Sequence, residues 1–341
     1  MTTIFVYEYC TALGLGRHPS DPAHSLWREG RAMRDAVVAD FRAIPNVTVR
    51  VLELGPRSSD EQSAFLREVQ SSTWTLVIAP ELNGELQRRC DWVREAGGQL
   101  LGCDRRSMAI TSDKLALAQR WTDADVPTPR TTSFSDGLQT PLRFPIVCKP
   151  IHGAGSTATF RFDDRTQLIH FRDNNLLEGF NESSLLLQDF VPGRAVSVAF
   201  LVGSGLAIPL LPTVQILSQD GRFRYHGGEM PIPTNLAERA VQLATRAIDA
   251  VEGLVGYVGV DLVLGEAAGG SEDFAIEINP RLTTSYVGLR QLAMFNIAQA
   301  MMAVVFGNPR PLMDWKPARV RFHVDGSVGV QALSESDISR T

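Results

Sequence analysis

Short apolar runs alternate with amphipathic stretches over the first hundred residues of the chain. The apolar runs have the length of strands, and the amphipathic stretches repeat their apolar residues every three or four positions, as on one face of a helix. This alternation is typical of a parallel α/β layer. It predicts strands at residues 4–9, 47–54, 74–79 and 99–102, and helices from Ser25 onward and at residues 61–69 and 84–96.

The pattern changes near residue 107. A helix capped by Ser112 or Asp113 is expected to run through Lys114 and to end before the segment V-P-T-P. Short strand patterns then follow, including F-P-I-V-C-K, T-A-T-F-R-F and S-V-A-F-L-V, together with one helix and a glycine-bearing turn. These patterns predict a compact α+β lobe over residues 144–200.

Longer elements are predicted in the last third of the chain. A helix at residues 235–251 is followed by strands at 257–264 and 274–279, which a polar turn connects, and by one long apolar helix at 286–306. The predicted organisation is an α/β domain at 1–105, a linker helix and connecting segment at 106–143, a small lobe at 144–200, a large lobe at 201–330 and a tail at 331–341.

Composition and charge limit the kinds of partner that the protein is expected to have. The 341 residues are 44% hydrophobic and 21% charged, as expected for a folded globular protein. The net charge of -5 comes with no basic block, which argues against a nucleic-acid partner and favours small metabolites. Neither an export signal nor a membrane-length apolar stretch is present, so the cytoplasm is the expected location and no membrane partner is expected.

Two neighbouring predicted strands carry a polar cluster. Glu277 and Asn279 alternate on one strand and therefore share a face, and Arg281 lies just past its end in the same direction. Asp261 is central in the other strand, so antiparallel pairing would gather all four side chains. An oxygen cluster of this kind suits magnesium. The alternative is a solvated sheet face, although Asp and Asn are depleted within apolar strands.

Two lysines and a glycine-bearing loop supply groups that can bind an anion. Lys149 ends an apolar strand, where a charge needs a partner, and Lys114 lies in the first turn of its helix. Either lysine alone could be a surface residue. The loop H-G-A-G-S follows Lys149 closely, and the backbone around Gly153 and Gly155 with the Ser156 hydroxyl could cover a phosphate. Most short glycine clusters are plain hairpin turns, which is the alternative.

Other nucleotide-binding signatures are absent from the sequence. It has no G-x-x-x-x-G-K-[ST] loop, and A-L-G-L-G-R-H lacks the third glycine of a dinucleotide fingerprint. The remaining element is L-L-L-Q-D-F-V-P-G-R at 185–194, which by itself is an apolar strand that enters a Pro-Gly turn.

The order of these motifs resembles the ATP-grasp superfamily. S-D-K, K-P, H-G-A-G-S, Q-D-F-V-P-G, G-V-D-L and E-I-N-P-R follow one another between residues 112 and 281. The resemblance covers roughly residues 105–310, and the first hundred residues resemble the pre-grasp α/β domain of that superfamily. It implies an ATP-grasp fold of mixed α/β and α+β class, with ATP and Mg²⁺ (or Mn²⁺) as cofactors. It also implies a carboxylate and an amine as small-molecule substrates, and homodimers are common in the family.

The resemblance assigns a role to each motif residue. Asp261, Glu277 and Asn279 match the metal ligands, and Arg281 and Lys149 match the catalytic cations. Ala195 stands where relatives commonly have an acidic residue for the ribose hydroxyls, which leaves the ribose contact open. The residues that match ATP contacts are Lys114, Lys149, Gly153, Gly155, Ser156, Gln188, Phe190 and Val191.

A narrower resemblance concerns the substrates. V-Y-E-Y, S-L-W-R-E-G-R-A-M, V-I-A-P-E and I-N-P-R-L-T-T-S-Y-V-G-L-R resemble segments of the tyramine:L-glutamate ligases of methanofuran-type cofactor biosynthesis. This resemblance implies that the γ-carboxylate of L-glutamate is activated as an acyl-phosphate and that tyramine then attacks. An ATP-grasp ligase with other substrates, and a catalytically silent ATP-binding module, are the alternatives.

Several polar residues are expected near the substrates. Glu8 and Glu81 lie near strand ends, and the segment Y-H-G-G-E-M-P at 225–231 is expected to be a loop in which His226 and Glu229 could orient the amine. A histidine in a loop is more often simply exposed. Glu29 and Arg31 of the S-L-W-R-E-G-R-A-M helix are expected to face solvent.

Overall fold

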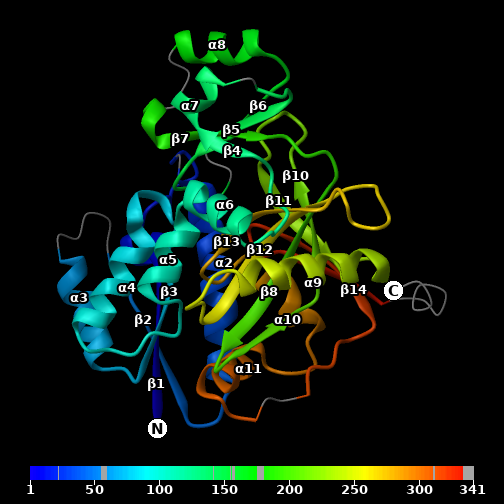
Figure 1. Cartoon of the computed structure of the whole chain (residues 1–341). Helices are drawn as coiled ribbons and strands as arrows, with labels where there is room; N and C mark the ends of the chain where they lie inside the picture. The colour runs from blue at the N-terminus through cyan, green and yellow to red at the C-terminus, as the bar shows by residue number, and fades with distance from the viewer. Residues whose placement is uncertain are drawn as a thin grey trace.

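The computed structural model describes residues 1–21, 23–54, 60–140, 142–153, 155, 158–174, 180–309 and 312–332. Within these ranges the strands form a three-stranded, a four-stranded and an eight-stranded sheet. The four-stranded sheet lies at the top of Figure 1, and the N-terminal sheet lies beside the eight-stranded sheet below it. No helix in the described ranges has the length and apolar character needed to cross a membrane.

The N-terminal sheet is parallel, as the alternating pattern predicts. Its order is β2-β1-β3, with β1 (Thr2–Glu8) in the centre between β2 (Val47–Val51) and β3 (Trp74–Ile78). The predicted strand at 99–102 is wrong, because its only pairing is an isolated bridge between Thr75 and Leu100. The helices here are α1 (Tyr9–Leu13), α2 (His24–Arg42), α3 (Glu61–Gln70) and α4 (Glu85–Glu95).

The four-stranded sheet is antiparallel and has its own apolar core. Its order is β4-β7-β5-β6, and buried side chains such as Phe134, Leu168 and Leu187 pack between the sheet and its helices. The elements are β4 (Thr131–Ser133), α7 (Phe134–Gln139), β5 (Ile146–Pro150), β6 (Phe160–Phe162), α8 (Arg165–Asp173) and β7 (Leu185–Asp189). Two helices, α5 (Arg105–Ser112) and α6 (Lys114–Asp123), precede it in the chain.

The eight-stranded sheet runs β13-β12-β8-β10-β11-β14-β15, and β9 pairs with β8. Its strands are β8 (Arg194–Gly203), β9 (Leu206–Pro209), β10 (Thr213–Leu217), β11 (Tyr225–Met230), β12 (Gly256–Leu264), β13 (Phe274–Asn279), β14 (Ala318–His323) and β15 (Val328–Ala332). The helix α9 (Thr234–Asp249) buries one apolar face against this sheet. Residues 333–341 of the predicted tail lie outside the described residues.

Strand membership differs from the sequence prediction in two places. The segment S-V-A-F-L-V was predicted in the small lobe, but it forms β8, which pairs with β12 over nine residues of the eight-stranded sheet. Conversely, β4 falls in the predicted connecting segment, yet it pairs with β7. Both pairings are long-range and leave no mark on local periodicity. The domain boundaries themselves stay predictions.

The predicted long helix at 286–306 is two helices, α10 (Ser285–Leu292) and α11 (Ile297–Phe306). Ala293 adopts an extended conformation, with ψ at 129°, and so ends the first helix. The Asn296 side chain accepts a hydrogen bond from the Gln299 N–H and caps the second helix.

The predicted loop at 225–231 is mostly the strand β11. Its two glycines allow close packing against β14, since a Cβ on Gly227 would lie 1.9 Å from the carbonyl oxygen of Phe322. The sequence Y-H-G-G-E-M therefore reflects tight strand packing at this position.

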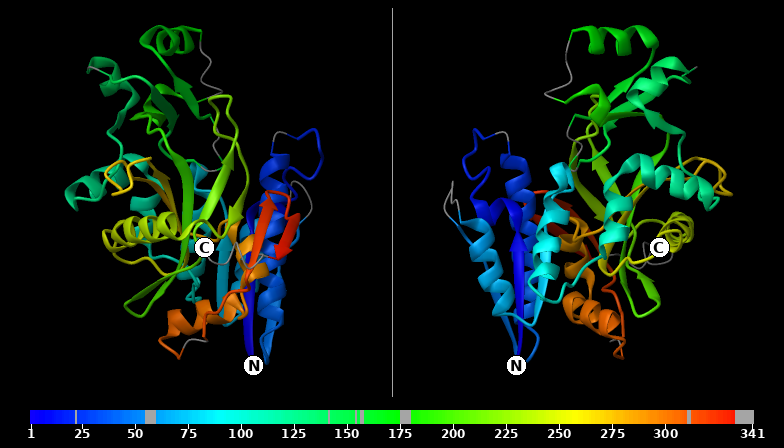
Figure 2. Two further views of the ribbon diagram at one scale, coloured as in Figure 1. Left: turned by 90° about the vertical axis from the view of Figure 1, so that its right-hand side faces the viewer. Right: turned by 60° about the vertical axis from the view of Figure 1, so that its left-hand side comes forward.

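The N-terminal helix α2 joins the first sheet to the C-terminal helices. Tyr286 donates its hydroxyl to Asp40 at 2.6 Å, and Arg290 pairs with the same carboxylate at 2.7 Å. Figure 2 shows the blue N-terminal segment beside the orange and red C-terminal elements. These contacts therefore fix the N-terminal helix α2 relative to the C-terminal helix α10.

Candidate functional site

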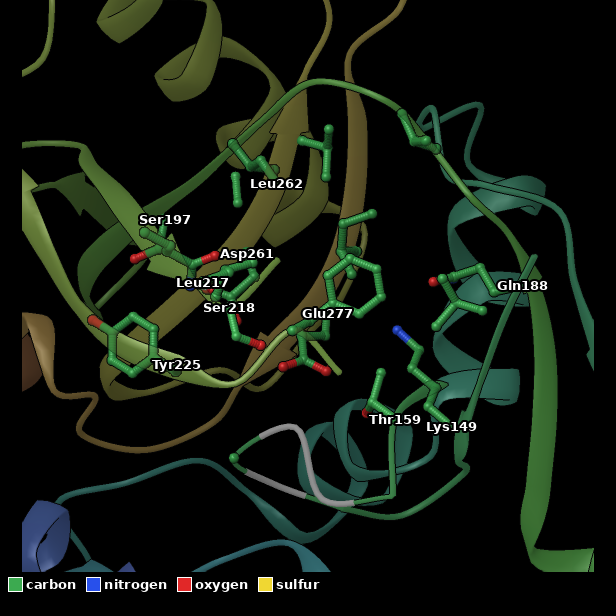
Figure 3. Close-up of a pocket in the computed structure, with 18 of the residues that line it drawn as sticks. Lys149, Thr159, Gln188, Ser197, Leu217, Ser218, Tyr225, Asp261, Leu262 and Glu277 are labelled. Carbon is green, nitrogen blue, oxygen red and sulfur yellow. Dashed lines mark hydrogen bonds between the residues drawn. The ribbon is translucent and has the colours of Figure 1, made fainter. Parts of the chain in front are cut away.

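A cavity of about 890 Å³ lies where the three parts of the fold meet. Lys149 and Gln188 come from the small sheet, Asp261 and Glu277 from the large sheet, and Glu29 from α2. Figure 3 shows Lys149 and Gln188 on one side of the cavity, and Asp261 and Glu277 across from them. The structure therefore brings residues that are far apart in the sequence to one place.

The predicted pairing of the two polar strands is confirmed. In the antiparallel β12-β13 pair, Asp261 lies opposite Glu277 and Gly259 lies opposite Asn279. The Asn279 amide donates to Asp261 Oδ2 at 3.0 Å. Gln215 of β10 donates to the other oxygen, Oδ1, at 2.9 Å. Two carboxylates and an amide thus share one face of the sheet.

The two carboxylates have different ionisation properties. Burial raises the pKa of Asp261 to about 8, and the charge of Glu277 adds to this effect. Burial also raises the pKa of Glu277, but Lys114 and Lys149 outweigh it and hold that pKa below its ordinary value. Without a bound cation, Glu277 therefore carries the negative charge first.

Both predicted lysines face this pair. Lys149 is buried at the end of β5, and burial lowers its pKa to about 8, partly offset by the charge of Glu277. Lys114, the first residue of α6, lies 3.4 Å from Glu277 Oε2 and donates to the Gly153 carbonyl at 2.9 Å. Lys114 therefore connects the glycine-bearing loop to the carboxylates.

The glycine-bearing loop borders the same cavity. Gly153 and Gly155 line it, and Gly155 has a φ of +66°, which glycine adopts without strain. Ser156, the third predicted member of this loop, lies outside the described residues.

The segment after β7 forms another part of the wall, with Gln188, Phe190 and Val191 all lining the cavity. Gln188 donates to the Thr131 hydroxyl at 2.9 Å, and the Arg161 guanidinium lies 4.4 Å from the centre of the Phe190 ring. Ala195 also lines the cavity and offers no side-chain oxygen there.

Arg281 lines the cavity, and an acidic residue of the N-terminal part of the chain fixes its position. Its guanidinium makes two hydrogen bonds of 3.0 Å to the carboxylate of Glu81, which follows β3 in the N-terminal sheet. Glu81 is buried, and the Arg281 side chain is 11% exposed. Glu81 therefore contacts the predicted catalytic cation, where the sequence analysis expected it to meet substrate.

Three predicted substrate contacts lie elsewhere. Glu8 is buried and caps α1, accepting hydrogen bonds from the N–H groups of Cys10 and Thr11. His226 is exposed, and Glu229 pairs with Arg321 at 3.2 Å; neither lines the cavity.

Several cavity residues were not predicted, Glu29 and Gln215 among them, and Tyr225 was predicted only as part of the segment 225–231. Gln215 had a signal, since it is a polar residue between Val214 and Ile216 in the strand T-V-Q-I-L. Glu29 was expected to face solvent, but it accepts a hydrogen bond from the Thr284 hydroxyl and lines the cavity. Arg31 is exposed, as predicted.

Relatives with curated activities resemble this chain over most of its length. A tyramine–L-glutamate ligase of Methanocaldococcus fervens is 26% identical over 304 residues, which cover 84% of this chain and 89% of that protein. The same enzyme of Methanocaldococcus jannaschii is 24% identical and covers 84% of each chain. D-alanine–D-alanine ligase B of Pseudomonas putida is 27% identical over 46% of this chain and 52% of its own.

Solved structures share the fold. An ATP-grasp superfamily protein from Archaeoglobus fulgidus superposes with a TM-score of 0.70 at 23% identity, covering 98% of this chain and all of that one. The ATP-grasp domain family matches residues 111–285, and the pre ATP-grasp 3 domain family matches residues 32–108. The first of these matches spans more than half of the chain, so the protein belongs to the ATP-grasp family.

Proposed function

We propose that this protein is an ATP-dependent, ADP-forming ligase that joins a carboxylate to an amine. One observation supports it most: a single cavity holds two lysines, a glycine-bearing loop, two facing carboxylates and an arginine held by an ion pair. Lysines and backbone N–H groups bind phosphates, and paired carboxylates bind a divalent cation. The relatives with curated names are ligases as well.

The residues present fit a magnesium ion. Asp261 and Glu277 face each other, Asn279 adds an amide, and burial together with the charge of Glu277 raises the pKa of Asp261. Magnesium takes one or two carboxylates and completes its shell with phosphate oxygens and water. When bound, it would neutralise phosphate charge during transfer. Within the described ranges, no group of three or more His, Cys, Asp or Glu side chains is arranged to hold a metal ion.

The nucleotide would lie between the two sheets. We assign Lys149, Lys114 and the loop of Gly153, Gly155 and Ser156 to the phosphates, and Gln188, Phe190 and Val191 to the adenine. Since positioning and charge neutralisation dominate phosphoryl transfer, the two lysines would contribute mainly by aligning the γ-phosphate with the acceptor.

The proposed reaction has two steps. A carboxylate oxygen of the substrate attacks the γ-phosphorus of ATP, and ADP leaves with the electrons of the broken P–O bond. The amine nitrogen then attacks the acyl carbon, loses a proton, and expels phosphate. Arg281, which lines the same cavity and is held by Glu81, would stabilise the oxyanion that forms on the acyl group.

We propose L-glutamate, through its γ-carboxylate, and tyramine as the substrates, which would place the protein in methanofuran-type cofactor biosynthesis in the cytoplasm. The support is the likeness to the two tyramine–L-glutamate ligases over 84% of the chain. A ligase for two amino acids is the second candidate, since the D-alanine–D-alanine ligases match part of the chain. A silent module is disfavoured because both carboxylates and Arg281 are retained.

The test is ADP release from Mg-ATP across a panel of amino acids and amines, each pair measured with and without its amine. We expect release that requires both L-glutamate and tyramine, with a γ-glutamyl amide detected by mass spectrometry. Release with another pair would replace the substrates and keep the reaction. Nucleotide binding without turnover for every pair would overturn the proposed activity.

A further inference from the structure

The cavity continues beyond the carboxylate pair toward α2. At this end it is lined by Glu29, Tyr225 and the segment Thr283 to Ser285 at the start of α10. Figure 3 shows Tyr225 on the opposite side of Asp261 from Lys149. This end therefore lies across Asp261 from Lys149, and the glycine-bearing loop approaches α2 at Leu26, one turn before Glu29.

Glu29 is fixed in this position. Its carboxylate accepts a hydrogen bond from the hydroxyl of Thr284, the residue before α10. About three turns further along α2, the Asp40 carboxylate binds Tyr286 and Arg290 of α10. These contacts attach α2 to α10, and the carboxylate of Glu29 cannot turn away from the cavity without breaking its hydrogen bond to Thr284.

The other carboxylates that line the cavity have partners. Asp261 and Glu277 form the facing pair, and Lys114 also neutralises Glu277. The remaining three are each paired with an arginine: Asp163 with Arg161 at 2.7 Å, Asp189 with Arg130 at 3.1 Å, and Asp220 with Arg224 at 3.7 Å.

Glu29 differs from them. Among the described residues it has no lysine, arginine or histidine nitrogen within 4.0 Å, although it is partly buried. The Tyr225 hydroxyl, in the same part of the cavity, likewise has no hydrogen-bond partner in the described ranges. Arg281 lines the same cavity, and the charge of Glu29 acts on it over a longer distance, but Arg281 forms its ion pair with Glu81. A partly buried carboxylate that lines a cavity without an ion-pair partner is suited to a cationic ligand, because the ligand restores the charge balance lost on burial.

We propose that Glu29 binds a protonated substrate nitrogen and that the Tyr225 hydroxyl contributes to the same subsite. The inference rests on the proposed ligase function and makes this end of the cavity the determinant of selectivity for cationic amines. The nitrogen could belong to the amine substrate or be the α-ammonium group of the amino acid. Both sources have the same chemistry, and the experiment distinguishes them.

The test compares wild-type protein with Glu29→Gln by calorimetric titration, in the presence of Mg-ADP, with tyramine and L-glutamate as probes. Glutamine keeps the size of the side chain and can still accept from Thr284, but it removes the charge. We expect about 10-fold weaker binding of one probe, the usual order for a lost charge contact, with unchanged ADP affinity. Weaker tyramine binding identifies the amine substrate as the source, and weaker glutamate binding identifies the amino acid.

Two probes that lack the nitrogen and a second variant complete the design. 4-Ethylphenol should bind wild type and Glu29→Gln equally, and glutarate, which is a dianion, should bind Glu29→Gln no more weakly than wild type. Glu95→Gln, at an exposed carboxylate on α4, should bind every probe as wild type does. Equal affinities of wild type and Glu29→Gln for both amines, or no binding of any amine by wild type, would overturn the inference. Charge-dependent amine binding without ADP release would instead leave it standing and overturn the proposed activity.

Discussion

The facing carboxylates Asp261 and Glu277 are the residues on which the proposed chemistry most depends. They lie opposite each other on two buried strands and have the lysines across the cavity. Their geometry follows from simple alternation along β12 and β13, which is why the sequence pattern could predict it.

Glu277→Gln tests this pair directly. The amide keeps the shape of the side chain and removes the charge that faces Lys114, so ADP release should fall by about 100-fold or more, as for other lost charge contacts to a transferring group. Glu95→Gln serves as the control and should release ADP at the wild-type rate. An unchanged rate in Glu277→Gln would show that the metal assignment is wrong.

Asp261→Asn should change how stability depends on pH. The pKa of Asp261 is raised to about 8, so the folded protein keeps a proton that the unfolded chain releases near pH 4. In the metal-free protein, the contribution of Asp261 to the free energy of unfolding is therefore fully present below pH 4 and is lost as the pH rises to about 8. Asparagine does not ionise, so the variant does not lose this contribution.

The measurement is the difference in melting temperature between Asp261→Asn and wild type, with a chelator present. The melting temperature of the variant should rise relative to that of wild type as the pH increases from 5 to 8.5. A difference that stays constant over this range would mean that Asp261 ionises normally in the folded protein.

The roles of Glu29 and Glu8 could not be predicted from the sequence. Both are acidic residues near the first strand and α2, and nothing local distinguishes a cavity carboxylate from a helix cap. Glu29 faces the cavity because α2 packs against α10, a contact between segments about 250 residues apart. Such contacts are set by the tertiary fold alone.

At the scale of elements, the ion pair of Glu81 and Arg281 joins the end of β3 to the end of β13. Glu81 is buried, Arg281 is largely shielded from solvent, and Glu81 accepts two hydrogen bonds from the guanidinium. The pair therefore fixes the position of the predicted catalytic cation relative to the N-terminal sheet.

Glu81→Gln should lower the turnover number for ADP release while the KM for ATP changes little, because Arg281 loses its position and the nucleotide contacts remain. Breaking a buried pair also lowers the free energy of unfolding by about 3–5 kcal/mol. Asp273→Asn is the matched control, since Asp273 pairs with Arg239 in a similarly buried position outside the cavity lining. If both variants lost stability and neither lost turnover, Glu81 would be structural only.

The Pro-Gly turn after β7 connects the four-stranded sheet to β8 of the eight-stranded sheet. Gly193 has a φ of +149°, and a Cβ there would lie 2.4 Å from the Leu264 carbonyl oxygen. Gly193→Ala should therefore reduce the free energy of unfolding by about 2–3 kcal/mol through strain and overpacking, and should weaken ATP binding at the adjacent wall.

Gly205→Ala separates backbone strain from overpacking. Gly205 also has a positive φ, but it has no neighbour within 4 Å of the added Cβ. Chemical denaturation should show the smaller loss, about 1 kcal/mol, for that variant. Equal losses in the two variants would mean that the close contact at Gly193 contributes nothing.

Elements with strong local signals could be predicted, and long-range arrangements could not. The antiparallel β12-β13 pair and the helix at 234–249 follow from periodicity and short connections. The split of α10 from α11 had a local signal in Asn296, a typical helix cap, that the apolar character of the segment obscured. The sheet to which β8 belongs depends on pairing with β12, some 60 residues away.

At the scale of the whole molecule, two sheets supply the charged groups of one cavity: the small sheet supplies Lys149, and the large sheet supplies Asp261 and Glu277. The family resemblance predicted this division, because motif order along the chain reflects the fold. It did not predict that Glu81, which follows β3 of the N-terminal sheet, holds Arg281. The expected homodimer stays a prediction.

The central claim is that the cavity transfers the γ-phosphate of ATP to a substrate carboxylate. The most direct measurement uses L-glutamate with ¹⁸O in its γ-carboxylate, Mg-ATP and tyramine, with mass spectrometry of the released phosphate. We predict one ¹⁸O atom in each phosphate, because the carboxylate oxygen that attacks phosphorus leaves with it when the amine attacks. Phosphate released during amide formation without ¹⁸O, or label found in AMP, would contradict an acyl-phosphate and with it the proposed mechanism.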